Sequence, residues 1–235
     1  RVIGNLLKSG KEYVCLMKIH SDVSEEVIRN TFKEFIGEIE QLPPKKSAVK
    51  RQVRTRSVYY LDVLEIDGRE VLFKVGCEAG TYIRKLCTDM GEKMNTKAHM
   101  HELVRTKVAN FSSDAWCSLH DLTDAYDALE KGDESVMKEI VKPIEDAVVN
   151  TKKIWLLDSA VDSVCHGAFL SVPGVAKLHE SVDHGDKVAL MTLKDELVGL
   201  GVAKMNAQNI LRQEKGVAVT ETKIFMERGT YPKRS

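Results

Sequence analysis

The sequence has few cysteines, and none of them is spaced for a metal site. The five cysteines are an odd number, no two form a Cys-x-x-Cys pair, and Cys165-His166 is the only close cysteine–histidine pair. This pattern excludes a zinc ribbon and a disulfide scaffold, and it is typical of reduced thiols in an intracellular protein. We therefore expect small, buried cysteine side chains and no metal ion.

The sequence also has no long apolar run and no net charge of either sign. No stretch of 18 apolar residues and no signal-peptide pattern occurs, so we expect no membrane span. The 35 basic and 35 acidic residues balance, so the overall charge does not indicate a polyanionic partner. A chain of 235 residues with 43% hydrophobic and 30% charged residues is long enough for one large domain, or for a domain with a small companion.

A strand-to-helix transition stands out between residues 71 and 94. The apolar run at residues 71–75 is followed by apolar residues at helical spacing: Ile83, Leu86, Cys87, Met90 and Met94. Gly80 permits a sharp turn, and we expect Thr81 to cap the helix. Arg84 then lies in the first turn, where the helix dipole disfavours a cation by about 0.3–1 kcal/mol. Either an anion offsets this cost, or Arg84 is an ordinary solvated side chain.

A strand is expected at residues 11–20, with apolar residues on both faces, as in a central strand of a covered sheet. Tyr13 lies in its first half, where a tyrosine most often serves packing. The next helix begins after Asp22 or Ser24 and ends near Gly37, and we assign it to the scaffold. The Asp67-Gly68 pair predicts a hairpin between strands at residues 58–66 and 70–75.

The segment at residues 43–56 begins with two prolines and continues as a basic run that no acidic residue interrupts. Its cations are Lys45, Lys46, Lys50, Arg51, Arg54 and Arg56. Such a run is usually a solvated face, but this one lies between a predicted helix and a predicted strand, inside a domain. We expect a hairpin that presents these six side chains as a phosphate-binding surface, on which the arginines bind bidentately.

The second half of the chain changes character near Asn150, where polar residues indicate a domain boundary. Short strand signals separated by glycines follow, which predicts a small β-barrel. We expect an α+β protein with a mixed or antiparallel sheet at residues 1–150, followed by a barrel domain with its tail at residues 151–235. The glycines of the barrel either make tight turns or let backbone amides approach a ligand.

Six motifs occur in order: Lys-Glu-Tyr at 11–13, PPxxSAVKR at 43–51, AGTYIRKLC at 79–87, AHMxEL at 98–103, DSAV at 158–161 and VPGxAKL at 172–178. Together they resemble the dyskerin-type pseudouridine synthases, which are the archaeal and eukaryotic H/ACA-guided enzymes, with a C-terminal PUA domain. The resemblance spans essentially the whole chain. It implies conversion of uridine to pseudouridine in rRNA or tRNA without any cofactor. It also implies that RNA and small H/ACA proteins are partners.

The resemblance also implies roles for single residues. Tyr13 would stack on the target base, Arg84 would pair with the catalytic aspartate, and Leu103 would line the uracil pocket. The basic run would be a loop that presses RNA into the site, and we add Tyr82 to the RNA contacts. In the PUA-like part, the expected RNA contacts are Gly167, Gly174 and Lys177.

The family's nucleophilic aspartate lies in a Gly-Thr-Leu-Asp-Pro segment, which does not occur in these 235 residues. We therefore interpret the sequence as lacking an N-terminal part and expect these residues alone to be inactive, with Asp89 the carboxylate nearest to Arg84 in sequence. The alternative is a non-catalytic RNA-binding or scaffold protein on the same fold. A translation-associated PUA protein is disfavoured, because Tyr13 and Arg84 would have no role in it. The wording of the motifs resembles archaeal members, which implies a cytoplasmic protein, or a nucleolar one in a eukaryote.

Overall fold

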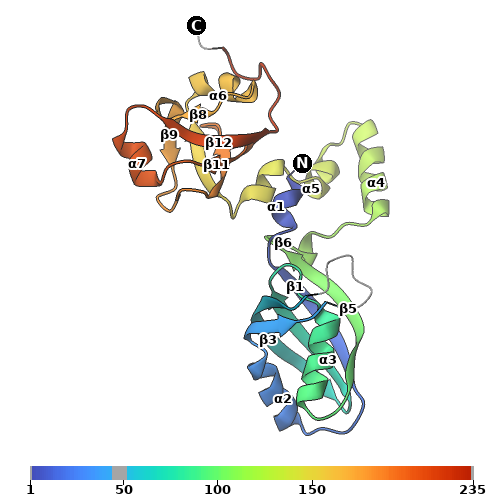
Figure 1. Cartoon of the computed structure of the whole chain (residues 1–235). Helices are drawn as coiled ribbons and strands as arrows, with labels where there is room; N and C mark the ends of the chain where they lie inside the picture. Colours follow the sequence, from blue (N-terminus) through green and yellow to red (C-terminus); the bar gives the residue numbers. More distant parts are fainter. Residues whose placement is uncertain (1, 44–51, 234–235) are drawn as a thin grey trace. The chain divides into compact units, whose positions relative to one another are not determined.

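The computed structural model describes residues 2–43 and 52–233, which form two compact units (Figure 1). One unit spans Ile3–Tyr126, and the other comprises Asp127 onward together with Val2. The first unit is built on a six-stranded sheet of order β2-β3-β4-β1-β5-β6, in which all neighbours are antiparallel. The predicted α+β class is confirmed. The boundary that we expect at residue 150 stays a prediction.

The first unit contains the short helix α1 (Ile3–Leu6), the central strand β1 (Lys11–Ile19) and the helix α2 (Glu25–Glu34). The strands β2 (Gly37–Gln41), β3 (Arg54–Asp67) and β4 (Glu70–Cys77) follow, and then the helix α3 (Ile83–Lys93). The strands β5 (Ala98–Val108) and β6 (Phe111–Ser112) complete the sheet. The 3₁₀ turn η1 (Ser113–Ala115) and the helix α4 (Leu119–Glu130) follow, and the boundary between the units falls within α4, after Tyr126.

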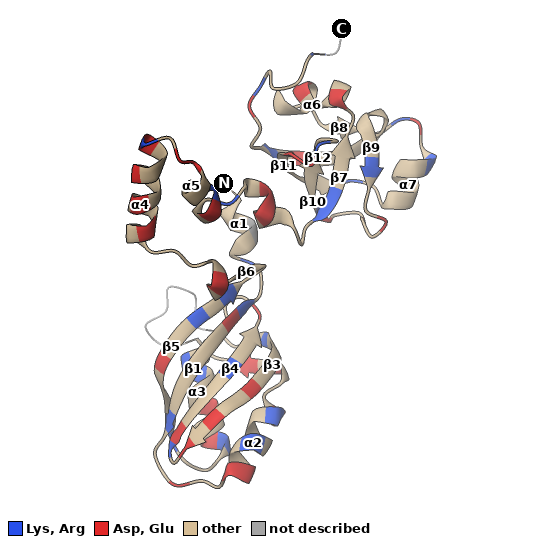
Figure 2. Cartoon of the chain, turned by 180° about the vertical axis from the view of Figure 1, so that it is seen from behind, with Lys and Arg blue, Asp and Glu red and all other residues tan. Residues whose placement is uncertain are grey.

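Both α2 and α3 cover the same face of this sheet, and the core lies between them and the strands (Figure 1). Cys15 and Met17 of β1 and Phe73 of β4 are fully buried there, against Phe32 of α2 and Leu86 of α3. The residues of β1 on the other face are half-buried or exposed, and Figure 2 shows charges of both signs on that side. The expectation of a sheet covered on both faces is therefore wrong for the described residues, because α2 and α3 both pack on the same side.

The second unit begins with α5 (Ser135–Ile140) and the 3₁₀ turn η2 (Ile144–Val148). A second six-stranded sheet, of order β8-β12-β11-β10-β7-β9, then contains β7 (Lys152–Leu156), β8 (Leu170–Ser171), β9 (Val175–Leu178), β10 (Lys187–Met191), β11 (Leu197–Ala203) and β12 (Val217–Ile224). The remaining elements are α6 (Asp158–Cys165), the turn η3 (Val172–Gly174) and α7 (Ala207–Arg212). The strands β7 and β10 run parallel, and the other paired strands are antiparallel.

The hairpin between β3 and β4 is confirmed, with Gly68 at φ +54° in its turn. The strand β3 begins at Arg54, so Arg54 and Arg56 lie in the sheet rather than in a loop. The cap of α3 differs from the prediction. Tyr82 occupies the N-cap position of α3, while the Thr81 hydroxyl donates to the carbonyl oxygen of Glu78 at 2.8 Å and stabilises the preceding turn instead.

Candidate functional site

Tyr13 lies near the start of the central strand β1, on the face that carries the helices. Its neighbour across the sheet is Arg105 of β5, whose guanidinium carbon is 5.4 Å from the centre of the Tyr13 ring. Leu103 pairs with Cys15 and so shares this face with Tyr13. Leu103 is 37% exposed, so part of its side chain is accessible from solvent. The structure thus brings Tyr13 and Leu103 together and adds Arg105, which the sequence did not single out as a site residue.

Arg84 is exposed in the first turn of α3, whose other face is buried. The predicted apolar stripe of Ile83, Leu86, Cys87 and Met90 is buried in the core, and Gly80 has the positive φ of +86° that the turn into the helix requires. The helix packs on β1, and the Cys87 and Cys15 sulfur atoms are 3.8 Å apart. The strand that bears Tyr13 and the helix that bears Arg84 are therefore in direct contact.

Gln41 fixes the start of this helix, which sequence analysis missed. The side chain of Gln41 is buried at the end of β2 and is bound to the backbone of Tyr82 in both directions. The Tyr82 amide donates to Gln41 Oε1 at 2.9 Å, and Gln41 Nε2 donates to the Tyr82 carbonyl at 3.2 Å. An amide side chain can supply this pair of contacts, because it carries one donor and one acceptor group. Arg84 thus lies on a helix whose N-cap residue, Tyr82, is hydrogen-bonded to the sheet.

No carboxylate forms an ion pair with Arg84 within residues 2–43 and 52–233. Asp89, the nearest acidic residue after Arg84 in the sequence, is paired with Lys85 one turn away on α3. Burial raises the pKa of the Asp89 carboxyl, and the Lys85 ammonium opposes this effect. Glu78 accepts a hydrogen bond from the amide of Ser57 and lies 3.6 Å from Arg56. These carboxylates therefore have structural partners of their own.

The basic run falls only partly on described residues. Lys45, Lys46, Lys50 and Arg51 lie outside them. Arg54 and Arg56 begin β3, and Arg56 donates to the carbonyl of its neighbour Thr55 at 2.9 Å and packs against the turn at Gly80. The Nε atoms of both arginines are buried without a hydrogen-bond partner in the described part of the chain.

In the second unit, the two glycines assigned to RNA contact have different surroundings. Gly167 ends α6 with a φ of +96°, and a side chain added there would meet open space. Gly174 is buried, and a side-chain carbon there would come within 2.9 Å of Ala160, so packing alone requires a glycine. A cavity of about 120 Å³ lies beside it, lined among others by Ser159, Ser163 and Phe169.

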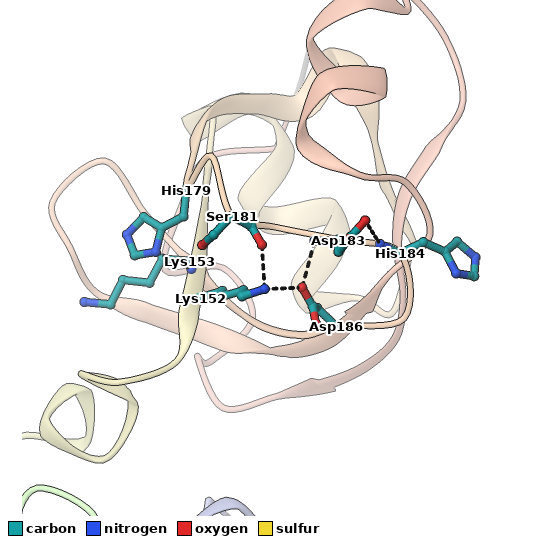
Figure 3. A network of polar contacts seen from close by, with 7 residues as sticks. All are labelled: Lys152, Lys153, His179, Ser181, Asp183, His184 and Asp186. Atoms are coloured by element: carbon teal, nitrogen blue, oxygen red, sulfur yellow. Dashed lines mark hydrogen bonds and ion pairs between the residues drawn. The ribbon is translucent and has the colours of Figure 1, made fainter.

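Lys177 lies at the sheet edge on β9, with its ammonium 4.2 Å from the centre of the Trp155 ring. The Trp155 indole donates to Asp195 at 2.6 Å, and the ring also contacts His179. Figure 3 shows Lys153 and His179 extending together from this edge. The His179 amide donates to the Lys153 carbonyl at 3.0 Å, so the backbones that carry these two side chains are held together at the edge.

A polar network behind this edge holds the loop from Ser181 to Asp186 (Figure 3). Lys152 donates to the Ser181 carbonyl at 2.5 Å and to Asp186 at 2.6 Å. Asp186 also accepts from the Asp183 amide at 2.7 Å. The hydrogen bond from Lys152 is the main cause that lowers the pKa of Asp186, so this carboxylate stays ionised at lower pH than an ordinary aspartate.

The described residues contain no group of three or more histidine, cysteine or acidic side chains that could hold a metal ion. Four of the five cysteines are buried, but Cys117 is exposed, which corrects the expectation that all are core residues. Cys117 lies in the loop before α4, where no sheet covers it. Among the described helices, none combines the length and the apolar character of a membrane span.

Residues 1–83 match the TruB family pseudouridylate synthase (N terminal domain), residues 84–149 match the tRNA pseudouridylate synthase B C-terminal domain, and residues 152–225 match the PUA domain. The probable tRNA pseudouridine synthase B of Methanothermobacter thermautotrophicus is 50% identical over 99% of this chain and 72% of its own length. The protein of the same name from Pyrococcus furiosus is 53% identical over 99% of this chain and 69% of its own length.

Two solved structures match the chain over nearly its whole length. A Cbf5-Nop10-Gar1 complex contains a chain with 52% identity and a TM-score of 0.94, and the match covers all of this chain and 72% of that one. An H/ACA RNP bound to a substrate RNA containing 2′-deoxyuridine contains a chain with 50% identity and a TM-score of 0.92, covering 99% and 71% respectively. With half of its residues identical to these relatives, the chain belongs to the TruB family of pseudouridine synthases and carries a C-terminal PUA domain.

Proposed function

We propose that the protein is an RNA pseudouridine synthase that converts uridine to pseudouridine in ribosomal or transfer RNA, within an H/ACA ribonucleoprotein. One observation carries this proposal: about half of the residues are identical, along the whole chain, to a Cbf5 chain that is assembled with Nop10 and Gar1. The side chains on the open face at Tyr13 suit the same chemistry. Its partners are a guide RNA, the substrate RNA and small proteins of the Nop10 and Gar1 kind.

Three side chains receive roles in this reaction. Tyr13 stacks on the flipped uracil, for which a half-buried aromatic ring with a polar tip is suited. Leu103 supplies an apolar wall on the same face of the sheet. Arg84 orients the nucleophilic carboxylate through its planar guanidinium, and that carboxylate belongs to the Gly-Thr-Leu-Asp segment of the family, which the 235 residues do not contain.

The reaction exchanges one bond to the ribose for another. The carboxylate adds to the sugar or to the base, the bond between N1 of uracil and C1′ breaks, and the uracil turns. A bond then forms between C5 and C1′, and the bond to the carboxylate breaks. The hydrogen of C5 leaves as a proton while N1 takes up a proton, so atoms and electrons balance without an oxidant. The chain's own contribution is to hold the flipped base and the carboxylate in position while excluding water.

Binding is divided between the two units. We assign phosphate contacts in the first unit to the basic run, including Arg54 and Arg56, and to the backbone near Tyr82. In the second unit we assign them to Gly167, Gly174 and Lys177. The relatives named above come from archaea, and we place the protein in the cytoplasm of such a cell.

The test uses a protein that contains these 235 residues together with the family's Gly-Thr-Leu-Asp segment, assembled with guide RNA and the small partner proteins. The substrate is an RNA with tritium on C5 of one uridine that the guide selects. Release of tritium into water is expected, because C5 loses its hydrogen when it bonds to C1′. A second RNA, with tritium on a uridine outside the guide target, is the matched control. Tight binding without release would instead support a non-catalytic RNA-binding scaffold.

A further inference from the structure

The ladder between β1 and β5 contains a bulge next to the site. Lys11 pairs with Val108 and Glu12 with Lys107, but Tyr13 pairs with Arg105. Thr106 is the extra residue, so Thr106 and Lys107 together lie opposite Glu12. A bulge of this kind re-aims the side chains that follow it.

The bulge decides which face Arg105 and Leu103 occupy. In a regular ladder, Tyr13 would lie opposite Thr106. Arg105 and Leu103 would then lie opposite Val14 and Leu16, on the other face of the sheet, because a shift of one residue exchanges the two faces of a strand. With the bulge, Arg105 lies over the Tyr13 ring, and Leu103 joins the same face. The composition of the site thus depends on one inserted residue.

The Glu12 carboxylate holds this bulge from the opposite face. The Thr106 hydroxyl donates to Glu12 Oε1 at 2.7 Å, and the Tyr60 hydroxyl donates to Glu12 Oε2 at 2.5 Å. Both oxygens therefore have a donor, from β5 on one side and from β3 on the other. The residues immediately beyond, Tyr13 after Glu12 and Arg105 before Thr106, are the pair that meets on the site face.

Tyr60 reaches Glu12 across a whole strand, because Gly76 of β4 lies between them. Tyr60 and Glu12 are both cross-strand partners of Gly76. A side-chain carbon at Gly76 would come within 2.2 Å of the Tyr60 ring, so the ring occupies the space that any other residue would fill. Tyr60, Gly76, Glu12 and Thr106 form one row across four strands, and we call these four residues the Glu12 row.

The charge state of Glu12 suits this role. The hydrogen bond from Tyr60 is the main cause that lowers the Glu12 pKa, with Thr106, Lys74 and Lys107 adding to it. Burial and the neighbouring carboxylate raise the pKa of Tyr60, which keeps its hydroxyl protonated as a donor. An ionised acceptor between two hydroxyl donors forms charge-assisted hydrogen bonds, which are stronger than neutral ones.

We propose that Glu12 is a positioning residue for pseudouridine formation, which holds the β5 bulge through Thr106 and Tyr60 and so keeps Arg105 and Leu103 on the Tyr13 face. This inference rests on the proposed function. Glu12 itself lies on the opposite face from the base and takes no part in the bond changes.

The test compares Glu12→Ala with Glu12→Gln in the assembled protein. The alanine variant should lower kcat roughly 10- to 100-fold, the loss expected when site residues move by about 1 Å, while RNA affinity stays unchanged. The glutamine variant keeps an acceptor and should stay within about fivefold of wild type. Thr106→Val is a milder variant in case Glu12→Ala folds poorly. Gly76→Ala should act like Tyr60→Phe, since both remove the donor from β3.

A core variant away from the row, Ile28→Val in α2, provides the matched control for lost stability. Ile28 is fully buried, so this variant should lower Tm without lowering kcat at temperatures where the protein is folded. If Glu12→Ala loses no more kcat than Ile28→Val at equal loss of Tm, Glu12 is an ordinary structural residue and the proposal is wrong.

Hydrogen exchange gives a second readout that does not need activity. In Glu12→Ala, the amides of residues 103–108 should exchange faster, while those of β2 and α2 stay protected. Unchanged protection of residues 103–108 would overturn the proposal. If the wild-type protein shows no turnover at all, the proposed function fails, and this exchange comparison still decides the role of Glu12.

Discussion

In the unit Ile3–Tyr126 the decisive polar contacts cross the strands of an open sheet, whereas in the unit after Asp127 they fasten a loop to the start of one strand. The Glu12 row ties β3, β4, β1 and β5 together beneath an exposed site. Lys152 and Asp186 join β7 to the loop at Ser181, behind an edge that presents cations. The Glu12 row determines which side chains lie on the face at Tyr13. The contacts of Lys152 determine where the loop from Ser181 to Asp186 lies relative to β7.

This difference matches two kinds of recognition. Chemistry on a base needs a few side chains held to within a fraction of an ångström. Binding a nucleic-acid strand needs basic side chains and backbone amides within reach of its phosphates. Such contacts tolerate small displacements of the protein groups. We therefore expect substitutions in the first unit to act mainly on kcat, and substitutions in the second unit to act mainly on RNA affinity.

The largest effect is expected at Arg84. In the assembled protein, Arg84→Lys keeps the charge but loses the planar fork, so kcat should fall roughly 10²-fold or more while RNA affinity barely moves. Arg84→Ala should be worse. Because Arg84 is exposed and no described carboxylate pairs with it, Arg84→Ala in the 235-residue chain alone should leave Tm nearly unchanged. Arg29→Lys on α2 is the control. If Arg84→Ala lowers Tm equally in the assembled protein and in the 235-residue chain, Arg84 is a structural residue.

A smaller loss is expected at Tyr13. Tyr13→Leu removes the flat ring from beneath the base, and a stacked base is worth about 1–3 kcal/mol, so kcat/KM should fall roughly 5- to 150-fold. Tyr13→Phe keeps the ring and should keep most of the stacking. Steady-state kinetics on a guide-selected uridine would give kcat/KM for the wild type, Tyr13→Phe and Tyr13→Leu, which should decrease in that order. If Tyr13→Leu is as active as Tyr13→Phe, stacking is not the role of this ring.

The basic run should change the salt dependence of binding rather than the chemistry. Replacing Arg51, Arg54 and Arg56 together should weaken RNA binding and reduce the salt slope by up to about three, at roughly 0.7–0.9 per phosphate contact. Arg56 is already engaged by Glu78 and Thr55, so it should contribute the least of the three. Binding isotherms between low and moderate salt would measure the slope. An unchanged slope would mean that these arginines form only a solvated face.

The smallest effect concerns the pH dependence of the second unit. The folded-state pKa of Asp186 is lowered, so its contribution to stability is present above the unfolded value near 3.8 and is lost as the pH falls through the folded value. Asp186→Asn should lower the stability at neutral pH by about 1 kcal/mol or less, because the pair with Lys152 is partly exposed. Its stability should then fall less steeply in acid. Thermal melts from pH 7 to pH 3 would test this, with Asp183→Asn as the neighbouring comparison.

The elements with a strong period could be predicted from the sequence. The buried stripe of α3, the central strand with Tyr13 and the Gly68 hairpin follow from spacing and turn chemistry that are local in the chain. The predicted cap at Thr81 was wrong, because Gln41 binds the backbone of Tyr82, 41 residues later, and the helix start is fixed there. A contact so distant in sequence leaves no local signal.

The site could be predicted only in part, for the same reason. The motifs named Tyr13, Arg84 and Leu103, but Arg105 joins them because a bulge changes the register of β5. A single inserted residue does not disturb the alternation of so polar a strand, so no pattern in residues 98–108 reveals it. Gly76 is the one residue of the Glu12 row that the sequence marks, since a glycine inside a strand often indicates that another group packs closely against the backbone. Here that group is the Tyr60 ring.

Photocrosslinking tests the division between the two units most directly. The substrate RNA carries 4-thiouridine at the guide-selected position and is irradiated in the assembled protein, and the crosslinked peptide is identified by mass spectrometry. We predict a crosslink on the face of the first sheet at Tyr13, or in the segment from Leu103 to Arg105. The same label in the guide RNA should instead crosslink to the second unit, near Gly167 or Lys177. A target uridine that crosslinks only to the second unit would contradict the account.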